Sequence, residues 1–531
     1  MDKYNYWLNN IQDNTLKEKL KNLPKEKLVN FDKSLSFGTS GMRGTMELGS
    51  FNVNELTVCK LAKAVAIFIN KNHTNKNVVV CFDTRLNSKQ YSRLFSRVLE
   101  KNGINVILFK DYAPTPLCVY ATTNLKAIMG VMITASHNAK EYNGIKLYDD
   151  KGLSINKKIQ VEISTIFDNV DEVNAYNEII KYKLKNVKYI NKEMQNNFAD
   201  RLKSNRSKNL KIVYTPLHGT GYYAVKRLFK NNNFTFITPS SQKKPDGRFP
   251  TCPYPNPEFD DAFTEAITLA KKRKADIIIA TDPDADRLGV AVFDGVKYVR
   301  LSGDEVGYIL AYTALDKKGK FIVTTVVTSP LIDNICKFKQ AVLFKTLTGF
   351  VNIGAKTFEC IHKYGADKFA LAYEESCGYI VRDDTYDKDG IYACLKICEI
   401  AEDLKNKNKT LIDLLDEIYS KVGYICVLRD NEVFKGEKAD IISTSKINTI
   451  RKQGLKSIAG YGITKIIDYL NDDTGLEKQN FLEFIGEDFS FILRPSGTEP
   501  KLKIYIYVLG EKIKAIQKAQ NILSAIRKIL E

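Results

Sequence analysis

Short runs of apolar residues alternate along the chain with longer stretches in which apolar positions repeat with a helical period. Each run ends in a polar loop, which is typical of a buried strand. The predicted strands cover residues 78–82, 106–109, 128–133, 211–214, 234–237, 276–280, 321–327, 341–344 and 368–373. Helical segments separate these strands, with Asn54 and Ser88 as plausible N-caps of the first two helices. The pattern therefore predicts three similar α/β domains with mixed or mostly parallel sheets.

The last part of the chain has a different pattern. Strands are predicted at residues 489–493 and 502–508, a polar loop joins them, and a helix follows. This favours a smaller C-terminal α+β domain, and residues 1–33 form a Lys-rich helical lead-in at the other end. The predicted domains are an N-terminal helical extension at 1–35, domain I at 36–205, domain II at 206–302, domain III at 303–421 and domain IV at 422–531.

Composition is that of an ordinary soluble globular protein, with 44% hydrophobic and 27% charged residues among 531. The net charge of +18 favours anionic partners without identifying one. The densest basic run, at residues 271–274, ends an amphipathic stretch that begins near Glu258, as expected for cations at a helix C-terminus. No Arg/Gly-rich tail accompanies the run, so no nucleic-acid partner is expected. Duplex DNA binding with a steep salt dependence would contradict that expectation.

The ten cysteines include no Cys-x-x-Cys pair, so reduced thiols are expected in place of a metal or disulfide framework. The polar start of the chain is not typical of a signal peptide. No apolar run approaches the ~20 residues that span a bilayer. We therefore expect a cytoplasmic protein with no membrane partner, either a monomer or a homodimer.

Residues 134–138, T-A-S-H-N, form a polar loop directly after a predicted strand. Its position would bring the Ser136 hydroxyl to the edge of the sheet where ligands bind. A serine there could equally cap the next element. His137 alone does not decide between the two, because adjacent residues rarely hydrogen-bond as a nucleophile and its base.

Residues 282–287, D-P-D-A-D-R, follow another apolar strand. Three carboxylates at alternate positions, Asp282, Asp284 and Asp286, are costly unless a cation neutralises them, and hard oxygen ligands suit Mg²⁺. An EF-hand is excluded because its sixth position, a glycine, is Arg287 here. A solvated acidic turn is the alternative. The metal site is favoured because Pro283 stiffens a loop between two apolar strands.

Two further loops carry weaker signals. E-E-S-C-G at residues 374–378 offers paired carboxylates and a hydroxyl that can bind sugar hydroxyls, although a surface turn would have the same composition. R-P-S-G-T-E-P at residues 494–500 combines an arginine for bidentate phosphate contact with two hydroxyls and a glycine turn. A polar hairpin turn is the alternative for the second loop.

Taken together, these loops suggest a phosphorylated hydroxyl, a Mg²⁺ site, a polyol site and a second phosphate site. In this respect the chain resembles the α-D-phosphohexomutases, which interconvert 1- and 6-phosphosugars or 1- and 5-phosphopentoses. The resemblance runs from about Ser36 to Val508. T-A-S-H-N with N-G-I-K at 143–146, followed by D-P-D-A-D-R, carries most of it, and the loops at 374–378 and 494–500 add support. It implies four domains around one central cleft.

The resemblance also implies a role for each matching residue. Ser136 would be the phosphoserine, and its phosphoryl oxygen would hold Mg²⁺ together with Asp282, Asp284 and Asp286. The residues implied at the reacting end are Arg43, Lys146 and Arg287. The residues implied to contact the sugar are Thr348, Gly349, Glu374 and Ser376. The residues implied to hold the non-reacting phosphate are Arg494, Ser496, Gly497 and Thr498.

The implied cycle passes one phosphoryl group from phospho-Ser136 to the free sugar hydroxyl. The resulting sugar bisphosphate, which is intermediate and activator, turns over, and its other phosphate returns to the serine. A general base must deprotonate the attacking hydroxyl. Lys146 is the first candidate, because nearby cations can lower the pKa of a lysine. His137 and Lys388 remain alternatives.

The strongest rival is an aspartyl-phosphate phosphatase of the haloacid dehalogenase type, in which D-x-D follows an apolar strand as Asp282 and Asp284 do here. That interpretation leaves Ser136 and Arg494 without roles. Hydroxylamine would cleave its acyl phosphate, whereas a phosphoserine survives acid.

Within the mutases, glucose or mannose is the expected substrate and a pentose is the alternative. The glucosamine branch usually has a histidine where this chain has Tyr379.

Overall fold

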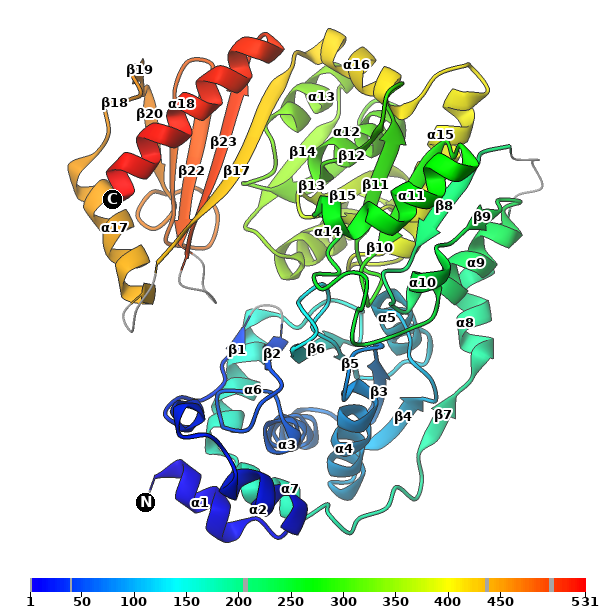
Figure 1. The fold of residues 1–531 in the computed structure, drawn as a ribbon, viewed down its shortest axis with the longest axis vertical. Coiled ribbons are helices and arrows are strands. Elements are labelled where there is room, and N and C mark those ends of the chain that lie inside the picture. The colour runs from blue at the N-terminus through cyan, green and yellow to red at the C-terminus, as the bar shows by residue number, and fades with distance from the viewer. Residues whose placement is uncertain (1, 39–40, 204–208, 435–438, 496–500) are drawn as a thin grey trace. The chain divides into compact units, whose positions relative to one another are not determined.

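The computed structural model describes residues 2–38, 41–203, 209–434, 439–495 and 501–531 (Figure 1). The chain divides into two compact units. One unit contains Met1–Val306 and Gly349–Leu411, and the other contains Gly307–Thr348 and Ile412–Glu531. In the part of the chain that the structure describes, no helix is both long enough and apolar enough to cross a bilayer. All ten cysteines are buried and free, as the sequence predicts.

The first unit begins with an α/β layer built on a seven-stranded mixed sheet of order β1-β2-β6-β5-β3-β4-β7. The strands β5, β3, β4 and β7 run parallel, whereas β1, β2 and β6 are antiparallel to their neighbours. The strands are β1 (Phe37–Gly38), β2 (Gly41–Thr45), β3 (Asn77–Phe82), β4 (Asn105–Phe109), β5 (Met129–Ile133), β6 (Tyr142–Asp149) and β7 (Lys188–Ile190). The helices are α3 (Glu55–Asn72), α4 (Ser88–Lys101), α5 (Thr115–Asn124), α6 (Lys157–Asn169), α7 (Glu172–Asn177) and α8 (Lys192–Ala199).

A second sheet of the same unit has five strands in the order β12-β11-β10-β8-β9. Its parallel pair β8–β10 continues into the antiparallel hairpin β10–β11, whose turn is residues 282–287. The strands are β8 (Ile212–Thr215), β9 (Phe236–Ile237), β10 (Ile277–Thr281), β11 (Leu288–Phe293) and β12 (Tyr298–Leu301). The helices and short 3₁₀ turn in this stretch are α9 (Gly221–Asn231), α10 (Ser240–Lys243), η2 (Asp260–Phe263) and α11 (Thr264–Arg273).

The remainder of the first unit is an antiparallel hairpin with its helices. These elements are α14 (Phe350–Tyr364), η3 (Ala366–Lys368), β15 (Phe369–Glu374), β16 (Gly378–Ile380) and α15 (Gly390–Lys405). Two helices run across the division between the units, namely α12 (Gly303–Ala314) and α16 (Leu411–Val422).

The second unit contains the parallel pair β13 (Phe321–Thr325) and β14 (Val342–Thr346), with α13 (Leu331–Lys339) between them in sequence. Its larger sheet is fully antiparallel, in the order β17-β23-β22-β21-β20, and differs from the sheets of the first unit as the sequence predicts. The elements are β17 (Ile425–Val433), α17 (Ala439–Gln453), β18 (Ser457–Ile458), β19 (Tyr461–Gly462), β20 (Lys465–Asp468), β21 (Leu482–Ile485), β22 (Phe489–Pro495), β23 (Lys501–Leu509) and α18 (Lys512–Leu530).

The strands predicted from apolar runs are confirmed to within a few residues, as is the N-cap at Asn54. The predicted cap at Ser88 is wrong. Asn87 occupies the N-cap position in the left-handed region, with φ of 65°, and makes no side-chain cap bond. The Ser88 hydroxyl instead donates to Asp83, because the buried carboxylate after β3 requires donors. The stretch expected to be helical from Glu258 begins as a helix only at Thr264, after the turn η2.

The N-terminal helices α1 (Lys3–Asn10) and α2 (Asn14–Lys21), with the turn η1 (Lys25–Phe31), pack on the first sheet's helical layer near α7 (Figure 1). Buried Trp7 donates from Nε1 to Glu172 Oε1 at 3.1 Å. Lys60 Nζ lies 3.1 Å from Glu172 Oε2, and Lys3 Nζ lies 3.2 Å from Oε1. One buried carboxylate on α7 therefore ties α1 to α3. Burial opposes ionisation of Glu172, but Lys60 and Lys3 outweigh it and hold the pKa below its ordinary value.

Glu172→Gln should lower the free energy of unfolding by on the order of 3 kcal/mol at neutral pH, because it leaves the Lys60 ammonium buried without its counter-charge. Urea denaturation measures the change. Because the folded-state pKa of Glu172 is lowered, the wild-type advantage should be present at neutral pH and disappear as the pH falls through that pKa.

The matched control is Glu162→Gln, which removes the 3.0 Å surface pair with Lys71. We expect a much smaller loss there, because solvent screens an exposed ion pair. Equal losses in the two variants would show that the buried carboxylate does not anchor the N-terminal helices.

Candidate active site

Ser136 lies in the loop after β5, in the left-handed backbone region with φ of 51°. Its backbone N–H donates to Thr134 Oγ1 at 2.8 Å, which stabilises this tight turn. The side chain is buried, and its Oγ donates to Asp282 Oδ2 at 2.7 Å. His137 Nδ1 lies 3.3 Å from the same Oγ. The loop therefore presents the serine hydroxyl to the acidic turn of the second sheet.

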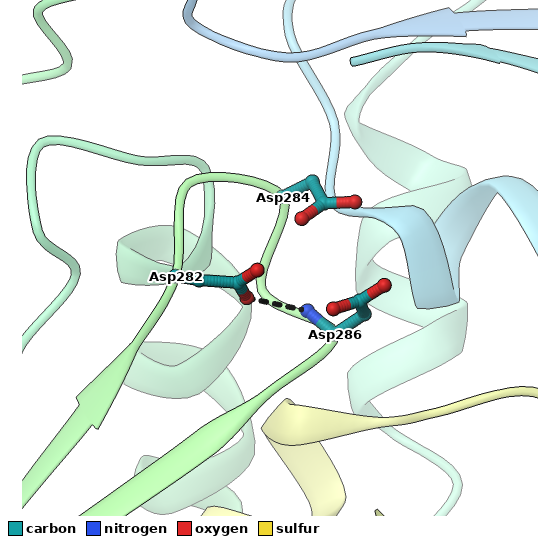
Figure 2. Close-up of side chains that lie close together, drawn as sticks. All are labelled: Asp282, Asp284 and Asp286. Carbon is teal, nitrogen blue, oxygen red and sulfur yellow. Dashed lines mark hydrogen bonds between the residues drawn. The ribbon is translucent and has the colours of Figure 1, made fainter. Parts of the chain in front are cut away.

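Figure 2 shows the three carboxylates of the acidic turn between β10 and β11, and all three side chains are fully buried. One oxygen from each of Asp282, Asp284 and Asp286 lies within 4.8 Å of the others. Asp282 Oδ1 accepts from the backbone N–H groups of Asp286 and Arg287 at 3.1 and 3.0 Å. Ala285 takes a left-handed conformation with φ of 54°, which closes the turn. The short hairpin thus converges the three side chains, as the alternate spacing predicts.

Cations from distant parts of the sequence face this turn. Lys146 Nζ, on β6, lies 2.8 Å from Asp284 Oδ2 and 2.7 Å from Asp286 Oδ2. Lys388 Nζ lies 3.5 Å from the same oxygen of Asp286. The three carboxylates repel one another inside the protein, and this positive charge favours the ionised forms of Asp284 and Asp286.

The pKa shifts follow from burial and these charges. Burial, then the neighbouring Asp284 and Asp286, raises the pKa of Asp282 well above its ordinary value. Burial would do the same to Asp284, but Lys146 outweighs it and the pKa of Asp284 is lowered. Burial lowers the pKa of Lys146, yet Asp284 and Asp286 outweigh that and raise it above its ordinary value. The expectation that neighbouring cations lower the pKa of Lys146 is therefore wrong, because two carboxylates lie closer.

The donor set of the turn fits a hard divalent cation. Asp284 Oδ1 and Asp286 Oδ1 are buried, and each lacks a hydrogen-bond partner among the described residues. A buried carboxylate oxygen without a donor costs free energy unless something positive contacts it. Oxygen ligands alone, with no sulfur or imidazole among them, favour Mg²⁺-type ions over softer metals. The three aspartates can therefore hold a metal ion.

Arg287 connects this turn to residues 374–378. Its Nη1 donates to Ser376 O at 2.8 Å and pairs with Glu258. Arg287 also forms a β-bridge with Gly378. Glu374 ends β15 and is half-buried; burial raises its pKa, although Lys388 and Arg287 oppose the shift. The structure thus brings the predicted sugar-contacting loop to the acidic turn within one unit.

Arg43 lies on β2 opposite Gly144 of β6. Its Nη1 donates to Asn138 Oδ1 at 2.8 Å, in the serine loop. Burial lowers its pKa, and Asp284 partly offsets this. The antiparallel pairing of β2 with β6 therefore brings Arg43 and Lys146 to the same end of the first sheet.

Three of the remaining predicted residues are described by the structure, and three lie outside the described residues. Gly349, with φ of 100°, is the N-cap of α14 in the first unit, whereas Thr348 belongs to the second unit. Arg494 stands near the end of β22 opposite Lys503, also in the second unit. Ser496, Gly497 and Thr498 lie outside the described residues.

Arg85, which the sequence pattern did not single out, contacts the serine loop. This buried side chain donates from Nη2 to Ser136 O at 2.6 Å and to Asn138 O, and from Nη1 to Ala139 O at 2.8 Å and Tyr142 O at 3.1 Å. Its Nε lies 3.4 Å from Asp83 Oδ2. One guanidinium therefore binds the backbone of most of the serine loop.

The signal for Arg85 was present in the sequence. Asp83 and Arg85 directly follow β3, which is parallel to β5, so both loops end at the same edge of the sheet. The carboxylate of Asp83 also accepts from Thr134 Oγ1 at 2.7 Å. Thr115 was missed as well. Its Oγ1, at the start of α5, donates to Asp284 Oδ2 at 2.6 Å.

Comparison with known proteins identifies similar sequences over most of the chain. Residues 34–174, 188–295 and 302–422 match the family models of phosphoglucomutase/phosphomannomutase α/β/α domains I, II and III. A phosphoglucomutase of Staphylococcus saprophyticus is 32% identical over 541 residues, which cover 96% of this chain and 97% of that one.

Solved structures share the fold. A putative phosphomannomutase from Thermus thermophilus superposes with a TM-score of 0.72 at 20% identity, covering 94% of this chain and 99% of that one. An N-acetylphosphoglucosamine mutase from Aspergillus fumigatus, solved with GlcNAc-6P and magnesium, gives a TM-score of 0.51 at 13% identity, covering 95% and 98%. Three α/β domains followed by a β-rich C-terminal domain are common to this fold, as the sequence predicts.

Arg85→Lys should lower kcat with little change in KM, because an ammonium cannot bind the four carbonyl groups that the guanidinium plane holds. A displacement of Ser136 by about 1 Å would cost on the order of 100-fold in rate. Steady-state kinetics measure kcat and KM, and thermal unfolding checks that the variant is folded.

Arg300→Lys is the matched control, because the Arg300 side chain pairs at the surface with Asp260, at 2.7 Å. Its kinetics should stay within about twofold of wild type. A folded Arg85→Lys variant with wild-type kcat would show that Arg85 does not position the serine loop.

Proposed function

The chain belongs to the phosphoglucomutase/phosphomannomutase family and is a phosphosugar mutase, and we propose that it interconverts the 1-phospho and 6-phospho forms of a hexose, glucose or mannose, through a phosphoserine at Ser136. The observation that carries the proposal is the buried Ser136 hydroxyl at 2.7 Å from Asp282 Oδ2, within a set of acids that can hold a metal. The aspartyl-phosphate phosphatase alternative is not favoured, because it leaves this hydroxyl without a role.

The proposed cycle conserves phosphoryl groups. Phospho-Ser136 transfers its phosphoryl group to the free hydroxyl of the sugar monophosphate, which forms a sugar bisphosphate and the free serine. After the bisphosphate turns over, the serine oxygen takes the other phosphoryl group, and the isomeric monophosphate leaves. Each half-reaction moves one proton from the attacking hydroxyl to the site and returns one to the leaving oxygen. The sugar bisphosphate is therefore both intermediate and activator.

We propose that Mg²⁺ is held by Asp282, Asp284, Asp286 and an oxygen of the phosphorylated Ser136. Bound by these residues, Mg²⁺ would supply positive charge that offsets the charge of the phosphoryl oxygens. Arg43 and Arg287 orient the transferring group from either side, since one reaches the serine loop and the other the sugar-contacting loop. Lys146 keeps Asp284 and Asp286 ionised.

Proton transfer at Ser136 Oγ is assigned to His137, whose Nδ1 lies 3.3 Å away. Lys146 and Lys388 contact the acids of the turn, so they stay candidates for the sugar hydroxyl. Glu374 and Ser376 are proposed to bind sugar hydroxyls, with Thr348 and Gly349 contacting the ring. Arg494, Ser496, Gly497 and Thr498 are proposed to hold the phosphate that is not reacting, where a bidentate arginine contact is strongest.

Glucose is the first choice of hexose, because the relative from Staphylococcus saprophyticus is named a phosphoglucomutase. A pentose 1-phosphate remains the alternative, and higher kcat/KM with ribose 1-phosphate than with glucose 1-phosphate would favour it. We also propose a cytoplasmic location and a monomeric or homodimeric state, as the sequence predicts.

Ser136→Ala should remove the phosphorylated fraction that intact mass spectrometry detects in the wild-type protein. It should also lower turnover of glucose 1-phosphate roughly 1,000-fold or more, because no other hydroxyl can replace the covalent carrier. A coupled assay for glucose 6-phosphate, with added sugar bisphosphate, measures the turnover.

Ser96→Ala is the matched control, since Ser96 is buried and its Oγ has no hydrogen-bond partner among the described residues. That variant should keep both the phosphorylated fraction and the turnover. Full activity in Ser136→Ala would rule out the phosphoserine mechanism.

A further inference from the structure

A cavity of about 500 Å³ lies in the first unit between one face of α4 and residues of α7 and the segment that follows it. α4 contributes Lys89, Arg93 and Arg97, and the facing wall comes from Asp13 and Tyr176. None of these residues belongs to the proposed active site. The cavity is therefore a separate hollow whose walls are basic on one side.

The three cations share one face of α4 because they are four residues apart. Successive side chains at this spacing lie one helical turn apart, so Lys89 and Arg97 are separated by roughly 12 Å along the axis. Like charges in this arrangement repel one another and destabilise an isolated helix. Lys89 and Arg93 are exposed and Arg97 is partly buried, so water screens this repulsion and a bound anion would offset it further.

The described residues supply little negative charge to offset it. No described residue forms a hydrogen bond or an ion pair with the side chain of Lys89, Arg93 or Arg97, and Arg97 Nε is buried without an acceptor. Asp13 is the one acid among the described lining residues. Its oxygens already accept from Tyr176 Oη at 2.8 Å and from the backbone N–H of Leu16 at 3.1 Å.

One further acid lies near the cavity without lining it. Glu55, at the start of α3, raises the pKa of the Cys59 thiol, whereas Arg97 lowers it. Glu55 and Arg97 therefore both lie near this thiol. Glu55 Oε1 accepts from Gln90 Nε2 at 3.2 Å. Three cations thus face the cavity against two carboxylates that already have donors.

A second cavity of about 380 Å³ lies on the neighbouring face of α4 and shares Lys89 and Arg93 with the first. Lys110, directly after β4, adds a fourth cation, and no described residue pairs with its side chain. Phe109 and Tyr189 line this side, and the Tyr189 ring is 59% exposed. No acid is among the described residues that line it.

We propose that these two cavities together bind a small molecule that carries two or more phosphoryl groups, at a site separate from the active site. Arginines match phosphate oxygens with planar pairs of donors, and lysines add point charges. Cations spread along roughly 12 Å of helix suit a chain of phosphates better than a single phosphate. Inorganic polyphosphate and a nucleoside triphosphate share this chemistry, and an exposed aromatic ring at Tyr189 would add stacking for the second only.

The test is isothermal titration of the full-length protein with tripolyphosphate at 0.15 M salt, without added divalent cation. Because the active site has arginines of its own, comparison between variants decides the outcome. Arg93→Gln/Arg97→Gln should weaken one binding event by tenfold or more, or abolish it. Its turnover of sugar phosphate should remain within about twofold of wild type.

The matched control is Lys271→Gln/Lys272→Gln, which removes the same charge from the basic end of α11 and should leave both affinity and stoichiometry unchanged. If Arg93→Gln/Arg97→Gln does not fold, Lys89→Gln/Lys110→Gln replaces it with the same expectation.

Titration with ATP separates the two ligand sources. Tighter binding of ATP that Tyr189→Ala reduces identifies a nucleotide, and equal binding identifies the phosphate chain alone.

The proposal is overturned if wild type does not bind tripolyphosphate, or if both α4 variants bind it as wild type does. It is also overturned if the α11 control loses as much affinity as the α4 variants, since net charge alone would then explain the effect.

Discussion

Three carboxylates buried on one short turn are the constraint on which the rest of the site depends. Burial opposes the ionisation of each, and each opposes the ionisation of the others. Lys146 contacts Asp284 and Asp286 and favours their ionised forms, and Ser136 donates to Asp282. The hairpin β10–β11, which fixes the spacing of the acids, and the strands that deliver their partners must therefore form together.

This constraint explains why contacts from remote parts of the sequence converge here. Lys146 comes from β6 of the first sheet, and Thr115 from the start of α5. Arg287 extends the turn to Ser376 on the hairpin β15–β16. Arg85 and Asp83 then fix the serine loop on which Ser136 lies. Positioning of the hydroxyl and neutralisation of the acids are thus two results of the same set of contacts.

The sequence predicted the strands and the acidic turn because those features are local. Apolar runs set the strands, and alternate spacing set the three acids. Arg85 and Thr115 escaped prediction because their contacts span about 50 and 169 positions and are decided by which strand ends meet. The raised pKa of Lys146 escaped for the same reason, since nothing local indicates that two carboxylates lie closer than any cation. The cap at Ser88 failed because a tertiary partner, Asp83, takes its hydroxyl.

The central claim is that the buried acids of this turn form a divalent-cation site beside Ser136. Electron paramagnetic resonance of added Mn²⁺ tests it directly, because bound and free Mn²⁺ give different signals. The account predicts one tightly bound Mn²⁺ per wild-type chain and none in Asp284→Asn. The control variant Asp294→Asn should still bind one Mn²⁺, because the exposed carboxylate of Asp294 only accepts from backbone N–H groups of a turn after β11. Absence of bound Mn²⁺ in wild type, or equal binding in Asp284→Asn, would contradict the account.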